Sequence, residues 1–587
     1  MKGWLAVAAV LWLLGAWVPA GASIRVDVQG VDGAVRDNVF AYLSLKRYAT
    51  LDDLTADVVE RIYQRGAGEI TDALKPFGYY QPTVTGSLKA EGANWVADFS
   101  VTPGPAVMLT AASVTLTGTG EGEPFLRELL DAHPLTAGSQ LDHAAYDHLR
   151  DELQRRATAN GYLDAHFTVN ELVVDAAALK ASAALALETG QRYRFGEVII
   201  EQDAVAPALV KRLLRFHAGD WYDSMALLRT QFALDDTRYF QMVVVLPGDR
   251  NSEQLTVPVH IDARRNDRHK YTIGAGYDAD YGARTRLTWD DRRLNRRGHR
   301  LHLETIISQR AQSATATYIV PIGDPALEKA QVDLTGSNSA LADVQVRSIS
   351  LRPSVTHVRG HWQHVSFMDF LRTESRAGGA SLHDTLVVPG LSIAPLPPTF
   401  LGDTAGVGVG HGLFAEVLGS FTGLGSRSTF LRLHVRDDWR VPLDRKWRLL
   451  FRAELGATAA HDFNDLPTQY RFFAGGDRSV RGYSFNSLSP VTDVAATPTT
   501  VAKLLRTGGK HLAVASVELE RDLPRGFAVA VFADGGNAFN RFGDPLQFAA
   551  GVGVRYKLPF VSVGLDIAQP LSRNGSPRLH LNISPVY

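Results

Sequence analysis

The chain has 587 residues, which is too many for one ordinary hydrophobic core and predicts several domains. Its 61 lysines and arginines nearly balance its 62 aspartates and glutamates, so the overall charge gives no reason to expect bulk nucleic-acid binding. The absence of cysteine excludes disulfides, cysteine metal sites and thiolate catalysis.

The N-terminus has the pattern of a secretory signal peptide. Lys2 gives a positive start, residues 4–18 form an apolar run, and Ala20-Gly21-Ala22 has the small-x-small pattern of a cleavage site. The apolar run is shorter than the roughly 20 residues of a spanning helix, so we predict a signal peptide over 1–22 rather than an anchor. No later stretch is a continuous apolar run of that length, so a mature chain in a membrane would have to form a closed barrel.

Residues 24–264 have a mixed α and β pattern that repeats about every 80 residues. In each repeat a helical stretch ends near a tyrosine and leads into a strand-like run; the tyrosines are Tyr79, Tyr162 and Tyr239. We interpret them as core aromatics at the corner between helix and strand, without chemical function. The three predicted units span residues 24–106, 107–192 and 193–264.

From residue 265 the pattern becomes an alternation of apolar and polar residues with a period of two. A soluble sandwich also alternates, with its apolar face inward. Here the alternation continues for more than 300 residues, and short turns alternate with long connections, as in outer-membrane barrels. At roughly 20 residues per strand and connection, residues 265–587 predict a transmembrane antiparallel barrel of about 16 strands.

A glycine-rich segment, residues 472–483, lies within this region and carries Arg481 in an Arg-Gly-Tyr triplet. An arginine inside a barrel needs a carboxylate partner, because an unpaired buried charge is costly. Asp534 shares one face of a predicted strand with Phe532, and an aspartate cannot face lipid cheaply, so we expect both side chains in the lumen. The predicted loop motif comprises Gly475, Gly476, Arg478, Arg481, Gly482 and Tyr483, and its partner on the wall comprises Phe532, Asp534 and Gly536.

Within this loop we expect Arg478 to make a second polar contact and Tyr483 and Phe485 to pack against the barrel wall. The pair of Arg481 and Asp534 has two open interpretations. It is either a buried pair that only closes the barrel, or a brace whose state affects the barrel seam.

The first and last predicted strands, about residues 270–278 and 578–587, contain glycine and proline, which weaken strand pairing. One interpretation is ordinary closure with a local imperfection. The other is a lateral gate, at which a client strand adds to the exposed edge by backbone hydrogen bonds. The candidate seam residues are Tyr271, Gly274, Gly276, Leu581, Ile583, Pro585 and Tyr587.

The sequence GGDRSVRGY at residues 475–483, followed by FADGG at 532–536, resembles the signature of the outer-membrane protein assembly superfamily, whose barrels insert or secrete other proteins. The resemblance implies that the loop folds back into the lumen and that Arg481 contacts Asp534. It also implies that the three repeats are POTRA domains, the periplasmic modules of that superfamily.

Three POTRA domains and a barrel of this size are similar to the branch of the superfamily found in the translocation and assembly module. That resemblance implies a barrel in the outer membrane of a Gram-negative bacterium, POTRA domains in the periplasm, and unfolded outer-membrane clients of the autotransporter kind. It further implies an inner-membrane-anchored periplasmic partner of the TamB type, which would contact the first POTRA domain. No cofactor, metal or enzymatic activity is expected.

Three alternatives remain. A two-partner secretion transporter of the same superfamily would have two POTRA domains and usually a plug helix. A barrel enzyme such as an outer-membrane phospholipase would need a Ser/His pair, for which no local spacing is evident. A passive porin would have no use for three periplasmic modules.

Overall fold

The computed structural model of the chain describes residues 24–49, 54–92, 94–377, 380–396, 410–494, 503–558 and 561–585. The predicted signal peptide and Tyr587 lie outside these residues. The chain forms two compact units: residues 1–197, 218–225 and 248–258 belong to the first, and residues 198–217, 226–247 and 259–587 to the second.

The first three-stranded sheet has the order β1-β3-β2, with β1 and β3 parallel and β2 and β3 antiparallel. Its elements are β1 (Ile24–Gln29), α2 (Gly33–Tyr42), α3 (Ser44–Arg47), α4 (Ala56–Leu74), β2 (Thr83–Glu91) and β3 (Asn94–Thr102). The apolar face of α4 packs on the sheet, because Ile70 and Phe99 are buried in one cluster with Val28 and Leu43.

The second sheet repeats this arrangement with the order β4-β6-β5. Its elements are β4 (Met108–Thr117), α5 (Pro124–Ala132), α6 (His143–Ala159), β5 (His166–Asp175) and β6 (Lys180–Glu188). Helix α6 is capped by Asp142, whose side chain accepts hydrogen bonds from the amides of Ala144 and Ala145. Just after this helix, Tyr162 is buried and its hydroxyl donates to Glu123 over 2.9 Å.

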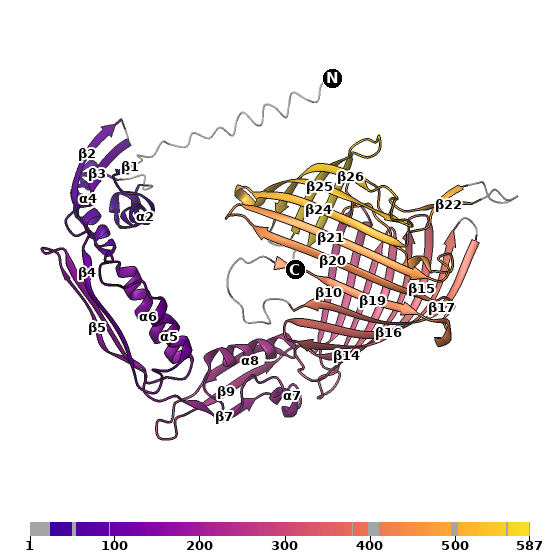
Figure 1. Cartoon of the computed structure of the whole chain (residues 1–587), viewed down its shortest axis with the longest axis horizontal. Helices are drawn as coiled ribbons and strands as arrows, with labels where there is room; N and C mark the ends of the chain where they lie inside the picture. The colour runs from indigo at the N-terminus through magenta and orange to yellow at the C-terminus, as the bar shows by residue number, and fades with distance from the viewer. Residues whose placement is uncertain are drawn as a thin grey trace. The chain divides into compact units, whose positions relative to one another are not determined.

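The third sheet has the order β7-β9-β8. Its elements are β7 (Arg194–Glu201), α7 (Pro207–Lys211), α8 (Ser224–Asp236), β8 (Phe240–Pro247) and β9 (Thr256–Arg265). The described chain thus has three small α/β units before the barrel, as the repeat predicted (Figure 1). The boundaries at residues 106, 192 and 264 stay predictions.

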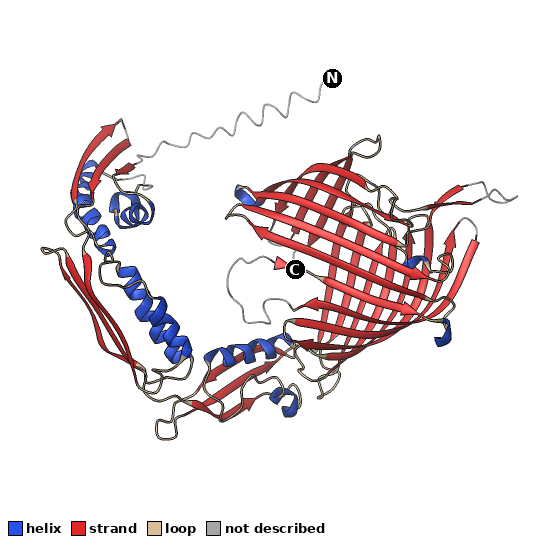
Figure 2. Ribbon diagram, viewed as in Figure 1, coloured by secondary structure: helices blue, strands red, loops and turns tan. Residues whose placement is uncertain are grey.

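The rest of the described chain forms a closed antiparallel barrel (Figure 2). Its strands are β10 (His269–Asp278), β11 (Gly282–Asp291), β12 (Arg300–Ser308), β13 (Ala311–Pro321), β14 (Lys329–Leu341), β15 (Val344–Arg359), β16 (Trp362–Ala377), β17 (Ala380–Pro395), β18 (Gly410–His411), β19 (Phe414–Ser420), β20 (Phe430–Pro442), β21 (Trp447–Ala460), β24 (His511–Asp522), β25 (Phe527–Phe539), β26 (Gln547–Lys557), β27 (Val561–Pro570) and β28 (Arg578–Pro585). Segments β18 and β19 both pair with β20 and fill one position, so these 17 segments make 16 strands, which confirms the prediction.

The outer face of the barrel is apolar and exposed, as a lipid-facing surface must be. Along β25 the exposed side chains of Val529 and Val531 alternate with the buried Ala530, Phe532 and Asp534. The valines of this strand therefore point away from the lumen, which is opposite to the arrangement in a soluble sandwich. Among the described helices, none is both long enough and apolar enough to cross a membrane.

Candidate functional site

The long connection between β21 and β24 folds into the barrel lumen. Phe472, Val480 and Leu488 of this loop are buried in one apolar cluster with Val514 of β24 and Ala549 of β26. The rest of the described connection includes a short hairpin of β22 (Val491–Val494) and β23 (Lys503–Arg506). The predicted loop motif therefore lies against the inner barrel wall.

Two glycines of the loop have no room for a side chain. Gly476 has a φ of 111°, and a Cβ there would lie 2.7 Å from the carboxylate oxygens of Asp280. Gly482 has a φ of 88°, and its Cβ would lie 3.2 Å from Ala549 on β26. Both positions combine a left-handed backbone with a close approach to the wall, so glycine is required.

Arg481 and Asp534 form a bidentate pair inside the barrel. The Nε of Arg481 donates to Oδ2 of Asp534 over 2.8 Å and its Nη2 donates to Oδ1 over 2.9 Å. The backbone amide of Arg481 also donates to Asp534 over 3.0 Å, and Ser516 donates to the same carboxylate over 2.6 Å. Arg481 is 5% exposed and Asp534 is 2% exposed, so the pair is out of contact with bulk solvent. The guanidinium carbon lies 3.4 Å from the ring centre of Phe532, a cation–π contact.

The guanidinium also contacts two carboxylates that sequence reasoning missed. Its Nη1 lies 2.6 Å from Glu518 of β24 and 3.4 Å from Asp566 of β27. Arg555 of β26 bridges the same two carboxylates. The alternation of predicted strands places such residues on the polar face, but it does not show which of them meet.

The charge environment favours the protonated arginine. Burial lowers the pKa of Arg481, but hydrogen bonds and charge attraction from Asp534 and Glu518 outweigh burial and raise the pKa above its usual range. The guanidinium is therefore a permanent cation held by a surplus of acceptors.

A second set of contacts joins the loop to the first hairpin and to the last strand of the barrel. The amide of Asp477 donates to Asp280 in the β10–β11 turn over 2.8 Å, and its carboxylate pairs with Nδ1 of His580 on β28. The amide of Gly482 donates to Nε2 of His580 over 3.0 Å. Because Nε2 accepts this hydrogen bond, Nδ1 carries the proton and donates a hydrogen bond to Asp477. Burial and the nearby charge of Asp477 raise the pKa of Asp280 to about 7.

The other predicted loop residues have varied surroundings. Arg478 is exposed and makes no hydrogen bond or ion pair with the residues that the structure describes, so the expected second polar contact is not formed there. Tyr483 is buried and its hydroxyl donates to the Phe548 carbonyl over 3.2 Å. A Cβ on Gly536 would lie 2.5 Å from the Ala513 carbonyl, so this glycine serves the approach of β24 rather than of the loop.

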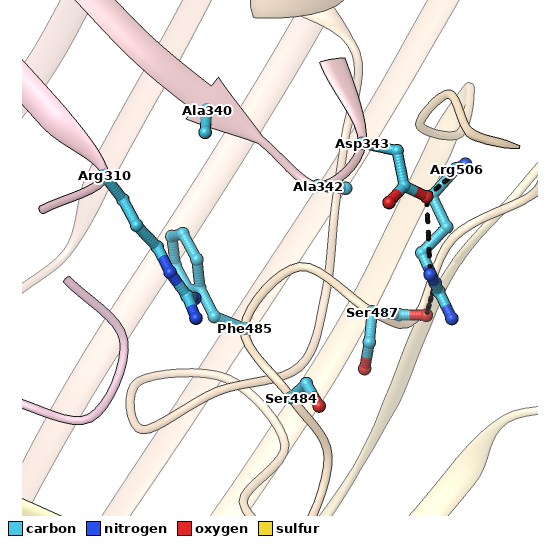
Figure 3. Close-up of a pocket in the computed structure, with 8 residues that line it drawn as sticks. All are labelled: Arg310, Ala340, Ala342, Asp343, Ser484, Phe485, Ser487 and Arg506. Carbon is cyan, nitrogen blue, oxygen red and sulfur yellow. Dashed lines mark hydrogen bonds and ion pairs between the residues drawn. The ribbon is translucent and has the colours of Figure 1, made fainter. Parts of the chain in front are cut away.

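Beyond the triplet, the loop lines a small cavity with two strand turns (Figure 3). Phe485 lies 4.9 Å from the Tyr281 ring, and Arg310 lies over the Phe485 ring at 5.9 Å. On the opposite wall Arg506 pairs with Asp343 over 3.3 Å. These contacts attach the loop to the turns after β12 and β14, separately from the Arg481 network.

The seam between β10 and β28 is short. In the described part of the chain it has two residue pairs, Tyr277 with Ile583 and Asp278 with Asn582. By contrast, β10 and β11 share ten pairs, and β27 and β28 share eight. A Cβ on Gly276 would lie 2.9 Å from the Ile583 carbonyl, so this glycine lets the two edges meet.

The remaining seam candidates lie on either side of these pairs. Tyr271 is 75% exposed on the outer face of β10, and Gly274 faces Arg286 of β11. On β28, Leu581 pairs with Leu565 and Pro585 pairs with Val561, both of β27. Of the predicted set, as far as the structure describes it, only Gly276 and Ile583 come into contact across the seam.

The chain is similar to known protein families and solved structures. Residues 410–583 match the Omp85 superfamily domain, and residues 25–103 match the family described as POTRA domain TamA domain 1. The structure of BamA from Haemophilus ducreyi lacking POTRA domains 1–3 has a TM-score of 0.63 at 13% identity and covers 81% of this chain and 100% of its own. CdiB from Acinetobacter baumannii has a TM-score of 0.45 at 14% identity and covers 82% of this chain and 90% of its own.

The chain contains an Omp85 superfamily domain, and it is an outer-membrane barrel with N-terminal POTRA domains, of the class that acts in protein transport and assembly. Its first POTRA domain is of the TamA type.

Proposed function

We propose that the protein assists the insertion of unfolded outer-membrane clients, of the autotransporter kind, through the seam between β10 and β28. The observation that carries the proposal is the two-pair seam beside neighbouring ladders of ten and eight pairs. Few ladder pairs would therefore be lost on opening, together with the contacts of Asp477 to Asp280 and His580, while the rest of the barrel keeps its ladders.

An opened seam presents a strand edge to an incoming chain. Backbone hydrogen bonds to such an edge do not depend on the client's side chains, so one device can serve many sequences. The driving force would be the folding of the client and the burial of its apolar surface in the bilayer. No nucleotide, metal, cofactor or covalent step is part of the proposal.

In this proposal the POTRA domains lie in the periplasm and receive a TamB-like, inner-membrane-anchored partner. The TamA type of the first POTRA domain, residues 25–103, supports that assignment. The rival in which a secreted chain passes through the pore requires the loop to leave the lumen. Movement of the loop out of the lumen would break the buried pair of Arg481 and Asp534 together with the contacts to Glu518 and His580.

Locking the seam with a disulfide tests the proposal, and the chain has no native cysteine to interfere. Tyr277→Cys and Ile583→Cys place the two thiols at paired positions of β10 and β28. We expect client assembly in cells to stop when the disulfide forms and to return on reduction.

The matched control is Leu334→Cys with Leu351→Cys, a pair across the long ladder of β14 and β15. Its oxidation should leave client assembly unchanged. Full activity of the protein with an oxidised seam would overturn the proposal.

A further inference from the structure

Arginines are concentrated where the third POTRA sheet joins the barrel. Residues 264–268 and 290–300 contain eight arginines against three aspartates, in a chain with a net charge of −1. Four of them, Arg265, Arg268, Arg293 and Arg296, line a cavity of about 440 Å³ together with Asp267 and neighbouring small or amide side chains. We call this the junction cavity.

The backbone around the junction cavity is fixed by hydrogen bonds. The Ala206 amide donates to the Arg296 carbonyl over 2.7 Å, and the Arg292 amide donates to the Arg268 carbonyl over 2.9 Å. The Nη2 of Arg293 donates to the Asn266 carbonyl over 2.5 Å. The arginines are therefore held by a hydrogen-bonded backbone rather than by a free loop.

The positive charge of the cavity is incompletely neutralised. Arg265 pairs with Asp203 over 3.3 Å and Arg268 with Asp291 over 2.8 Å, whereas the Nε of Arg293 is buried without a partner among the described residues. Burial and the charge of Arg265 lower the pKa of Arg293. A buried donor without an acceptor is costly, so an anionic oxygen entering the cavity would be favourable.

The junction cavity lies at the edge of the lipid-facing surface. By strand register, Asp291 lies between His269 and Leu301 on the outer face of the barrel. Two residues further along these strands, the next row of outward-facing side chains contains Tyr271, Trp289 and Leu303. Tyr271 is 75% exposed, so this row faces the hydrocarbon. Two residues along a strand correspond to about 7 Å, which is comparable to the roughly 5–8 Å thickness of the headgroup region on each side of the hydrocarbon core.

We propose that the junction cavity binds the phosphate-bearing headgroup of an anionic phospholipid in the leaflet next to the POTRA domains. Guanidinium groups suit phosphate because their donors match its oxygens in bidentate fashion. The position beside the apolar row favours a lipid over a free anion, because the acyl chains would lie along the outer face of β10 and β11. This site does not depend on whether the seam opens.

Native mass spectrometry of the full-length protein in a neutral detergent tests the site, with phosphatidylglycerol, phosphatidylcholine and inorganic phosphate as probes. The variant Arg265→Gln/Arg296→Gln removes two lining charges; among the described residues Arg265 makes only an exposed ion pair with Asp203, so the fold should persist. We expect phosphatidylglycerol to bind about 30-fold more weakly to the variant, with little binding of the other two probes to either protein.

The matched control is Arg264→Gln/Arg297→Gln, which removes the same charge from neighbouring exposed arginines that do not line the cavity. It should retain phosphatidylglycerol binding within about twofold. An equal loss in the control would mean a diffuse field and no site. Equal binding of inorganic phosphate would mean a free-anion site. Binding of polyglutamate, used as a fourth probe, without binding of phosphatidylglycerol would mean an acidic protein partner; each of these results would overturn the proposal.

Discussion

At the scale of single residues, Arg481 has more acceptors than one carboxylate offers. Asp534 takes two side-chain donors and the backbone amide, and Glu518 takes a third guanidinium donor. Removing one member of such a buried network leaves the others charged and unpaired, which costs more than the pair itself contributes.

We therefore expect Arg481→Ala and Asp534→Ala each to destabilise the protein by about 3–5 kcal/mol in denaturant unfolding. The double variant should lose less than the sum of the two, because the second change removes a charge that the first left unpaired. Arg478→Ala is the control within the same loop, and its effect should stay within about 0.5 kcal/mol, since Arg478 is exposed. Strictly additive effects of Arg481→Ala and Asp534→Ala would contradict the expected coupling.

Asp280 predicts a pH dependence of stability. Its pKa is raised from 3.8 to about 7 by burial and by the charge of Asp477, with Asp278 adding to the rise and His580 opposing it. Between these values the folded state binds a proton that the unfolded state does not, so stability falls as the pH rises towards about 7.

In Asp280→Asn this part of the slope should disappear, which melting temperatures between about pH 5.5 and about pH 8.5 would show. Asp249→Asn changes an exposed aspartate of the first unit and should keep the slope of the parent. A parent and an Asp280→Asn variant with the same slope would exclude Asp280 as its source.

The sequence indicated the central pair but not its surroundings. Arg481 and Asp534 were predictable because a lone charge on a buried face demands a partner. Glu518, Asp566 and Arg555 come from three further strands, and their meeting depends on the register of β24, β26 and β27. Local sequence does not determine that register, and the same reason hides His580 as the partner of Asp477.

At the scale of elements, β10, the first strand of the barrel, has one edge that is paired along its length with β11 and one edge that is paired only briefly with β28. Gly276 permits the contact with Ile583, because any side chain there would meet the Ile583 carbonyl at 2.9 Å. The glycines and proline of the terminal strands indicated a weak seam. The extent of pairing could not be predicted, since closure joins residues from opposite ends of the barrel.

Gly276→Val should push β28 away and break the two seam pairs. We expect faster hydrogen exchange at the amides of Tyr277 and Asp278, measured by mass spectrometry on the detergent-solubilised protein. Gly336→Val is the control, because a Cβ at that strand position meets nothing within 4 Å. Unchanged exchange at Tyr277 and Asp278 in Gly276→Val would show that the seam does not depend on this glycine.

At the scale of the whole molecule, three repeated α/β units precede the barrel, and the period of the sequence predicted their number. Each unit leaves sheet edges free: in the order β1-β3-β2, strand β2 has a single neighbour. A free edge of the first POTRA domain is a physical candidate for contact with the proposed TamB-like partner, because an extended segment can add to it.

A photo-crosslinking residue at Ser87, which is exposed on β2, should capture that partner in living cells. The matched position is Val173, 58% exposed on the free edge strand β5 of the second POTRA domain. We expect mass spectrometry to identify the inner-membrane-anchored partner from Ser87 and much less of it from Val173. Equal capture at both positions would place the contact elsewhere on the arm.

The inward loop also has a consequence for the order in which the barrel itself matures. Asp477 meets Asp280, which is 197 positions away in the sequence, and His580, which is 103 positions away. Contacts between residues so far apart form late, because the chain between them must first be organised. Docking of the loop therefore cannot be completed before the first hairpin and the last strand are both in place. A docked loop is thus a sign that the barrel has closed.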